Sequence, residues 1–381
     1  MKFNTKVIHA GVEPDPTTGA IMTPIFQTST YVQSAPGVHK GYEYGRAKNP
    51  TRTVLQDNLA ALENAKYAIA FASGLAATDA IMKTLKSGDE VISTNGLYGG
   101  TYRLMRRIYE PFGIEFKFVE MGDAADIAQH FTEKTKMIWV ETPTNPMLDI
   151  IDIEAVCKIA KAHNILVCVD NTFASPYLQT PLDLGADLIC HSATKYLGGH
   201  SDVVLGAVVT SNEELAKQLY FIQNATGAIP GPQDCFLLIR GIKTLHLRVQ
   251  RACENAETIA KFLAAQPKVA NVYWPGFETH PNHEVAKKQM KMFGAMVSFD
   301  FKTDTMETAS KVLENTHYFS LAESLGGVES LIGHPATMTH GSVPREERLK
   351  IGLTDSLIRM SVGVEDVEDL INDLKAAFEY L

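Results

Sequence analysis

The sequence lacks the features that mark redox, membrane and secreted proteins. Its five cysteines form no C-x-x-C pair, which fits a reducing compartment. No uncharged apolar run is long enough to cross a bilayer, and Met1 to His9 lack the apolar core of a signal peptide. We therefore expect a cytoplasmic protein with reduced cysteines and no membrane partner.

Basic clusters and metal-binding frames are also missing. The formal net charge is -9, with acids and bases interspersed along the chain, which predicts no nucleic-acid partner and leaves small charged substrates open. The pairs His280 with His283 and His334 with His340 lie outside any helical H-E-x-x-H frame. A metal hydrolase is therefore disfavoured, and no metal site is predicted.

Helical and β-branched segments alternate from residue 50 onward, which is typical of a mostly parallel sheet with helices on both faces and an antiparallel strand among the last ones. The expected helices are 51–63, 75–86, 101–112, 123–132 and 152–164. The expected strands are 67–72, 90–94, 115–119, 137–141, 165–170, 186–191 and 203–210. The predicted fold class is α/β.

The two ends of the chain differ from this central part. A helix-rich stretch near 212–266 leads to strands near 270–274, 295–301 and 357–362 and to a closing helix near 365–379. The first fifty residues are rich in proline and have no regular period. We expect an arm over 1–48 that contacts a neighbouring subunit, a main domain over 49–245 and a smaller α/β domain over 246–381.

A lysine follows the strand that ends near His191, in the segment from Asp187 to Ser201. A lone lysine is usually a solvated surface charge. Here Ser192 and Thr194 lie within three residues of Lys195. A buried amine can form a Schiff base with a carbonyl cofactor, and the hydroxyls can bind its phosphate. Pyridoxal 5′-phosphate requires both partners.

Two further segments complete such a site. The apolar strand 165–170 ends in Asp170, which could pair with a protonated pyridine nitrogen, although alone this acid would more often cap a turn. The strand 67–72 passes through Gly74 and Leu75 into a helix whose first N–H groups could bind a phosphate. Such a turn is common, and only the order of the three segments makes the prediction specific.

Seven motifs resemble those of the Cys/Met-metabolism family of pyridoxal-phosphate enzymes, and together they span nearly the whole chain. They are Tyr44-x-Arg46, Ser73-Gly-Leu75, Tyr98-Gly-Gly, Glu141-Thr-Pro-Thr-Asn-Pro146, Val169-Asp-Asn-Thr172, Ser192-Ala-Thr-Lys195 and Ser361-Val-Gly-Val-Glu365. The resemblance implies the aspartate-aminotransferase type of fold, pyridoxal 5′-phosphate as cofactor, and a homotetramer built from active dimers.

The resemblance also implies roles for individual residues. Lys195 would be the Schiff-base lysine, Asp170 the partner of the ring nitrogen, and Tyr98 a catalytic aromatic on the pyridine face. The other implied cofactor contacts are Gly74, Leu75, Asn145, Ser192 and Thr194 from the same subunit, with Tyr44 and Arg46 from the adjacent one.

On residue type alone, the candidate substrate contacts admit more than one role. Arg359 lies in an apolar strand and could bind a carboxylate with both guanidinium nitrogens, or form a structural ion pair. The resemblance adds Glu323 and Ser324. Glu43 and Glu323 could meet the distal ammonium of cystathionine, and Arg103 a carboxylate, unless all three are solvated charges.

The expected function is a carbon–sulfur lyase of transsulfuration and amino-acid biosynthesis. It would perform γ-elimination on cystathionine, giving cysteine, 2-oxobutyrate and ammonia, with β-elimination as a side activity. The alternative is a γ-synthase that joins an activated homoserine to cysteine. A different class, a non-catalytic binding or scaffold protein, would keep the fold without Schiff-base chemistry.

Overall fold

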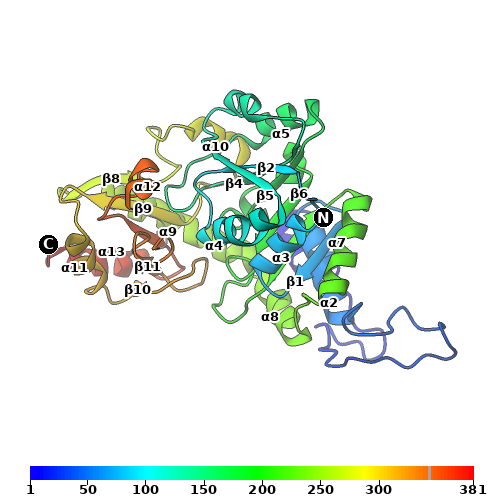
Figure 1. The fold of residues 1–381 in the computed structure, drawn as a ribbon. Helices are drawn as coiled ribbons and strands as arrows, with labels where there is room; N and C mark the ends of the chain where they lie inside the picture. The colour runs from blue at the N-terminus through cyan, green and yellow to red at the C-terminus, as the bar shows by residue number, and fades with distance from the viewer. Residues whose placement is uncertain (342–344) are drawn as a thin grey trace.

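The computed structural model describes residues 1–341 and 345–381, and two β-sheets organise them (Figure 1). The larger sheet has seven strands in the order β1-β7-β6-β5-β4-β2-β3. Only β7 runs antiparallel to its neighbours, β1 and β6. These strands are β1 (Tyr67–Phe71), β2 (Glu90–Thr94), β3 (Glu115–Val119), β4 (Thr135–Glu141), β5 (Leu166–Asp170), β6 (Leu188–Ser192) and β7 (Gly206–Thr210). The α/β fold class and the mostly parallel central sheet are confirmed.

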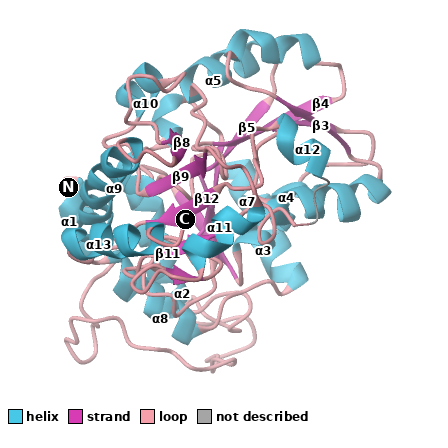
Figure 2. Cartoon of the chain, turned by 90° about the vertical axis from the view of Figure 1, so that its left-hand side faces the viewer, coloured by secondary structure: helices cyan, strands magenta, loops and turns pink. Residues whose placement is uncertain are grey.

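Helices cover both faces of this sheet, which is why its strands are almost continuously apolar. On one face, residues of β1, β4 and β6 pack with α3 and α7; on the other, strand residues pack with α2, α5, α8 and α9. Figures 1 and 2 show the two helical layers. Their bounds are α2 (Pro50–Leu62), α3 (Gly74–Met82), α5 (Ile153–Ala162), α7 (Glu213–Thr226), α8 (Pro232–Ile242) and α9 (Leu245–Ala264).

A smaller sheet lies beside the first, with the order β10-β11-β12-β9-β8. Its strands are β8 (Val269–Tyr273), β9 (Met296–Phe301), β10 (Ser320–Leu321), β11 (Leu331–Gly333) and β12 (Ile358–Ser361). The helices of this part are α10 (His283–Gln289), α11 (Met306–Leu313), α12 (Arg345–Lys350) and α13 (Val367–Phe378). Phe378 of α13 packs against Phe299 and Phe301 of β9, so the closing helix covers this sheet.

Several helical segments differ from the sequence-based expectation. The segment 101–112 divides into α4 (Gly99–Leu104), a π-helical turn (Met105–Tyr109) and a 3-10 turn (Glu110–Phe112). Pro111 cannot donate an α-helical hydrogen bond, and Gly113 ends the segment in the left-handed conformation. The segment expected as helix 123–132 is a 3-10 helix (Ala124–His130) with one buried residue, because so short an apolar stripe cannot stabilise an α-helix.

The first fifty residues contain a helix that the sequence did not predict, α1 (Phe3–His9). Val7 is buried, and the Phe3 ring meets the Tyr177 ring edge-on at 5.5 Å. A short α6 (Ser175–Leu178) presents Tyr177. Tertiary packing therefore stabilises α1, which has neither a side-chain cap nor an acidic first turn.

The fold also constrains other classes of site. The five cysteines are buried and unpaired. Among residues 1–341 and 345–381, no cluster of histidine, cysteine and acidic side chains has the membership needed to hold a metal ion. Within the same ranges no helix combines the length and the apolarity that crossing a bilayer requires.

Candidate active site

The carboxyl ends of β4, β5 and β6 open into a cavity of about 330 Å³. Glu141, Asp170 and Ser192 come from these three strand ends, while Arg359 comes from β12 of the smaller sheet and Glu323 from the loop between its strands β10 and β11. In open parallel sheets, ligands bind at the carboxyl edge. The chain therefore brings residues from widely separated segments to one hollow between the two sheets.

Lys195 lies in the cavity, just beyond the end of β6. Its Nζ donates a hydrogen bond to Ser324 Oγ at 2.7 Å. Burial and the nearby Arg359 guanidinium lower the pKa of Lys195 to about 8, against a smaller opposing effect of Glu323. An amine with this pKa is partly neutral near pH 7 to 8, and so it can act as a nucleophile and as a proton carrier.

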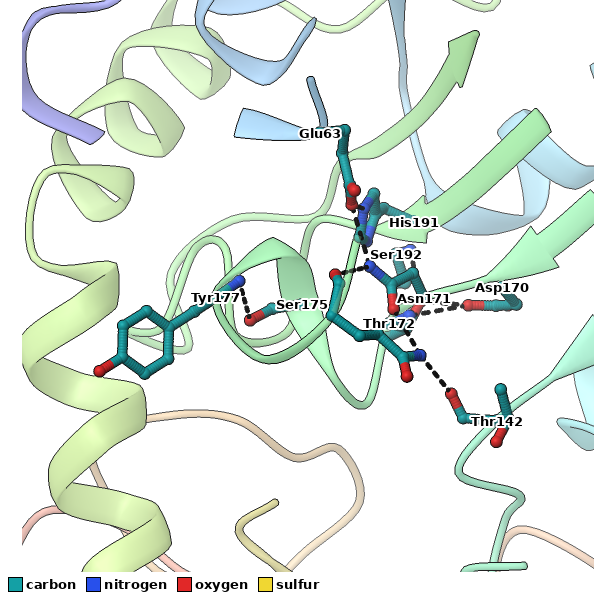
Figure 3. A network of polar contacts seen from close by, with 10 residues as sticks. Glu63, Thr142, Asp170, Asn171, Thr172, Ser175, Tyr177, His191 and Ser192 are labelled. Carbon is teal, nitrogen blue, oxygen red and sulfur yellow. Dashed lines mark hydrogen bonds and ion pairs between the residues drawn. The ribbon is translucent and has the colours of Figure 1, made fainter. Parts of the chain in front are cut away.

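Two carboxyl groups stand side by side at the edge of the sheet. Glu141 and Asp170 are register partners on β4 and β5. Asp170 Oδ1 accepts Thr172 Oγ1 at 2.5 Å and Thr172 N at 3.1 Å (Figure 3). Burial raises the pKa of Asp170, opposed by these bonds and by His191. Burial and the Asp170 charge raise the pKa of Glu141 well above its usual range. One negative charge at this edge is favoured over two.

The turn between β1 and α3 provides a cradle for an anion. Ser73 caps α3, accepting the N–H of Ala76 at 3.0 Å. A β-carbon at Gly74 would lie 2.8 Å from Ser192 Cβ, so only glycine permits this approach. The first N–H groups of α3 thus face the cavity with Leu75, Ser192 and Thr194 on its walls. Free helix N–H groups and hydroxyls suit a phosphate.

Tyr98 also lines the cavity, at the start of α4. Its N–H donates to Glu141 Oε2 at 2.8 Å, and the residue is 43% exposed. A β-carbon at Gly100 would overlap the Tyr98 ring, and one at Gly99 would lie 2.7 Å from Thr339 O. Neither glycine can therefore be replaced by a larger residue without displacing Tyr98 or Thr339.

Arg359 of β12 is buried and lines the same cavity as Lys195. Its Nη1 donates to Asn145 Oδ1 at 2.9 Å and its Nη2 to Ser324 O at 3.1 Å. Burial lowers the pKa of Arg359 to about 10. Within the described part of the chain, no carboxylate lies at ion-pair distance from this guanidinium, so a carboxylate on a ligand is a fitting partner. Ser324 has a positive φ of 97°, a strained conformation typical of functional sites.

Four of the expected contacts lie outside the cavity of this chain. Tyr44 and Arg46 are on the exposed arm, where Arg46 Nη1 donates to Asn224 O at 2.7 Å. Glu43 is exposed near His39, and Arg103 lines a separate surface hollow on α4. One chain alone therefore brings together eleven of the sequence-predicted residues and leaves these four elsewhere. The eleven are Gly74, Leu75, Tyr98, Asn145, Asp170, Ser192, Thr194, Lys195, Glu323, Ser324 and Arg359.

Several cavity residues received no role from the sequence, among them Glu141, Thr172 and Thr339. Glu141 and Thr172 stand in motifs that pointed to the family, but their hydrogen bonds to Tyr98 and Asp170 depend on the fold. Thr339 lines the cavity from a loop before the undescribed residues. An acid or a hydroxyl at the end of a predicted parallel strand was the available signal for the first two.

The arrangement fits the aldehyde, the ring nitrogen and the phosphate of pyridoxal 5′-phosphate. The cavity has an amine for the aldehyde, a carboxylate for the ring nitrogen and an anion cradle for the phosphate. The model of the Cys/Met metabolism PLP-dependent enzymes matches residues 4–379. The chain belongs to this family. Its members use pyridoxal phosphate, so the cofactor predicted from the sequence is confirmed.

Relatives with three different names match almost the whole chain. A cystathionine beta-lyase of Coxiella burnetii is 53% identical, covering 98% of this chain and 97% of its own. A cystathionine gamma-lyase of Dictyostelium discoideum is 51% identical, and the match covers 99% of this chain and 98% of the relative. A cystathionine gamma-synthase of Mycobacterium tuberculosis is 48% identical, and the match covers 98% of this chain and 96% of the relative. Similar identities to all three leave the specific activity open.

The solved structures agree with this family assignment. The crystal structure of a cystathionine gamma-lyase from Lactobacillus plantarum complexed with L-serine matches with a TM-score of 0.97 and 46% identity, covering 100% of this chain and 99% of that one. The backbone is thus shared along its whole length. The chain is a homologue of lyases and a synthase.

Proposed function

We propose that this chain is a carbon–sulfur lyase that performs γ-elimination on cystathionine, giving cysteine, 2-oxobutyrate and ammonia. The observation that carries the proposal is the position of Lys195, whose Nζ lies in the cavity with a pKa lowered to about 8. γ-Elimination requires proton transfers at two substrate carbons, and therefore a base that can gain and lose a proton near neutral pH.

The cavity residues have different roles around the substrate. When bound, pyridoxal phosphate supplies an aldehyde for the substrate amine and a ring that accepts electrons. Asp170 holds the ring-nitrogen proton, and Arg359 binds the α-carboxylate with its two terminal nitrogens. Lys195 Nζ would take the proton from the α-carbon, give it up, and then be free to take one from the β-carbon. The bond between the γ-carbon and sulfur breaks, the sulfur leaves and takes up a proton to give cysteine, and proton uptake at the γ-carbon followed by hydrolysis gives 2-oxobutyrate and ammonia.

Glu323 supports a substrate with a second ammonium group. It lines the cavity beside Ser324 and is exposed toward the opening. Cystathionine carries an ammonium at its far end, which an acid at the opening can attract. The tight packing at Gly99 and Gly100 leaves no space for a larger side chain next to Tyr98, so selection of the distal end falls to the opening of the cavity.

Product analysis with L-cystathionine tests the proposal. γ-Elimination gives 2-oxobutyrate and cysteine, whereas β-elimination gives pyruvate and homocysteine, and chromatography separates the two oxo acids. The alternative, γ-replacement, is favoured by the gamma-synthase relative and would form cystathionine from an activated homoserine and cysteine. Pyruvate as the main oxo acid, or γ-replacement as the faster reaction, would overturn the lyase assignment.

A second measurement separates an enzyme from a non-catalytic scaffold. Borohydride reduction followed by peptide mass analysis should find the cofactor joined to Lys195. An unmodified peptide would remove the proposed chemistry while leaving the family and fold intact.

A further inference from the structure

A cluster of buried polar side chains lies behind the strand ends that face the cavity (Figure 3). Glu63 follows the last turn of α2, and His191 is in β6; each is only 1% exposed. His191 Nε2 lies 2.6 Å from Glu63 Oε1. Because a carboxylate oxygen accepts, the ring N–H is the donor. This buried pair has no place in the chemistry described above.

The pair is joined to neighbouring strands by side-chain amides. Asn171 Nδ2 donates to the same Glu63 Oε1 at 3.0 Å and to Gln179 O at 3.1 Å. Gln179 Nε2 returns a bond to Asn171 Oδ1 at 2.9 Å and donates to Thr142 O at 3.0 Å. The residues that follow β4 and β5 are thus tied to β6 by bonds additional to the ladder.

Two members of the cluster are adjacent in sequence to cavity residues. Asn171 lies between Asp170 and Thr172, and His191 precedes Ser192. Asp170, Thr172 and Ser192 line the cavity, and Ser192 N donates to Thr172 Oγ1 at 2.9 Å. Side chains alternate across an extended backbone, so the cluster holds one side of the strand ends while the other side faces the cofactor site.

This arrangement is costly for stability alone. Glu63 Oε2 is buried and, among residues 1–341 and 345–381, has no hydrogen-bond partner. Apolar side chains of similar volume usually stabilise a core at least as well as a buried polar pair. We propose that Glu63 and His191 are positioning residues, which fix the ends of β5 and β6 so that Asp170 and Ser192 keep the separation required by the cofactor.

A second effect of His191 is electrostatic. Burial raises the pKa of Asp170, and His191 is among the groups that lower it again. The imidazole therefore favours the ionised carboxylate that would pair with the ring nitrogen. The inference rests on the proposed roles of Asp170 and Ser192, and it concerns how these residues are held.

Glu90 offers a matched control at the opposite end of the same sheet. It is 1% exposed and accepts Thr135 Oγ1 at 2.5 Å and Thr132 Oγ1 at 3.1 Å. It begins β2, whereas the cavity lies at the carboxyl ends of the strands. Replacing this acid removes a similar buried carboxylate without touching the cavity.

The test compares Glu63→Leu and Glu63→Gln with Glu90→Leu. For each purified protein, the thermal unfolding temperature without cofactor, the dissociation constant of pyridoxal phosphate and the visible circular dichroism of the bound cofactor are measured. Glu63→Leu should weaken cofactor binding about tenfold and change the dichroism, since one charge-assisted acceptor is lost. Glu63→Gln keeps an acceptor and should recover most of the affinity. Glu90→Leu should lower only the unfolding temperature.

Wild-type affinity and dichroism in Glu63→Leu, whatever its unfolding temperature, would overturn the inference. If Glu63→Leu does not fold, His191→Phe and His191→Gln replace it, because the glutamine amide can still donate to Glu63. Equal affinities in that pair would also overturn the inference. Failure of the proposed function is distinguishable: a different main oxo acid would overturn the lyase assignment and leave this inference untouched, whereas failure of the proposed cofactor site would show as wild-type protein that forms no adduct at Lys195.

Discussion

The cavity and the amino-terminal arm differ in whether their side chains find hydrogen-bond partners and burial within one chain. In the cavity, Lys195 and Arg359 both have hydrogen-bond partners within the same chain. On the arm, Ile21 is 82% and Val32 95% exposed, and this blue segment projects from the body in Figure 1. The cavity is preorganised by its own fold, whereas the arm presents apolar surface that a neighbouring subunit could cover.

Replacing Lys195 should have the largest effect on turnover of all the changes considered. Lys195→Ala removes the amine that is proposed to move the protons, so turnover should fall by on the order of 10⁴-fold. The arm should be unaffected, and the unfolding temperature should not fall. Steady-state rates with cystathionine provide the measurement. Turnover within tenfold of wild type would show that another group is the base.

The lowered pKa of Lys195 predicts a pH dependence of stability in cofactor-free protein. The folded lysine loses its proton near pH 8, whereas the unfolded one keeps it up to about pH 10.4. Between these values the unfolded state binds more protons, so stability rises with pH. Relative to Lys195→Met, wild type should gain about 3 kcal/mol across this window. Urea unfolding of both proteins at pH 7.5 and pH 10.5 gives the difference, and parallel curves would contradict the burial of this amine.

The strand pattern made much of the cavity predictable. β2 and β3 have the expected bounds, and short apolar runs between helical segments predict strands in an alternating α/β chain. Asp170 and Ser192 meet because parallel strands place their carboxyl ends on one edge. The pair Glu63 and His191 was not predictable, because its members are 128 residues apart and no local pattern links them. The position of Arg103 on an outer face of α4 likewise depends on packing.

Complementation tests whether the arm completes another chain's cavity. Arg46→Ala should lower turnover about tenfold if this guanidinium binds a neighbour's phosphate. Joint refolding with Lys195→Ala should then restore about a quarter of wild-type activity, since half of random dimers are mixed and each has one intact site. Activity that stays at the mean of the two variants would assign Arg46 to its own chain, where it contacts Asn224 O.

The smallest effects are expected for two acidic residues, one in the cavity and one on the arm. Glu323 lines the cavity, while Glu43 lies near His39 on the arm. Glu323→Gln should raise the KM for cystathionine about threefold to fivefold with little change in kcat, because an exposed charge pair contributes about 1 kcal/mol at most. Added salt should reduce the difference. Glu43→Gln should raise the KM similarly only if the arm of a neighbouring subunit reaches the cavity opening. The ratio of the two KM shifts then compares the contribution of each chain to binding the distal end of the substrate.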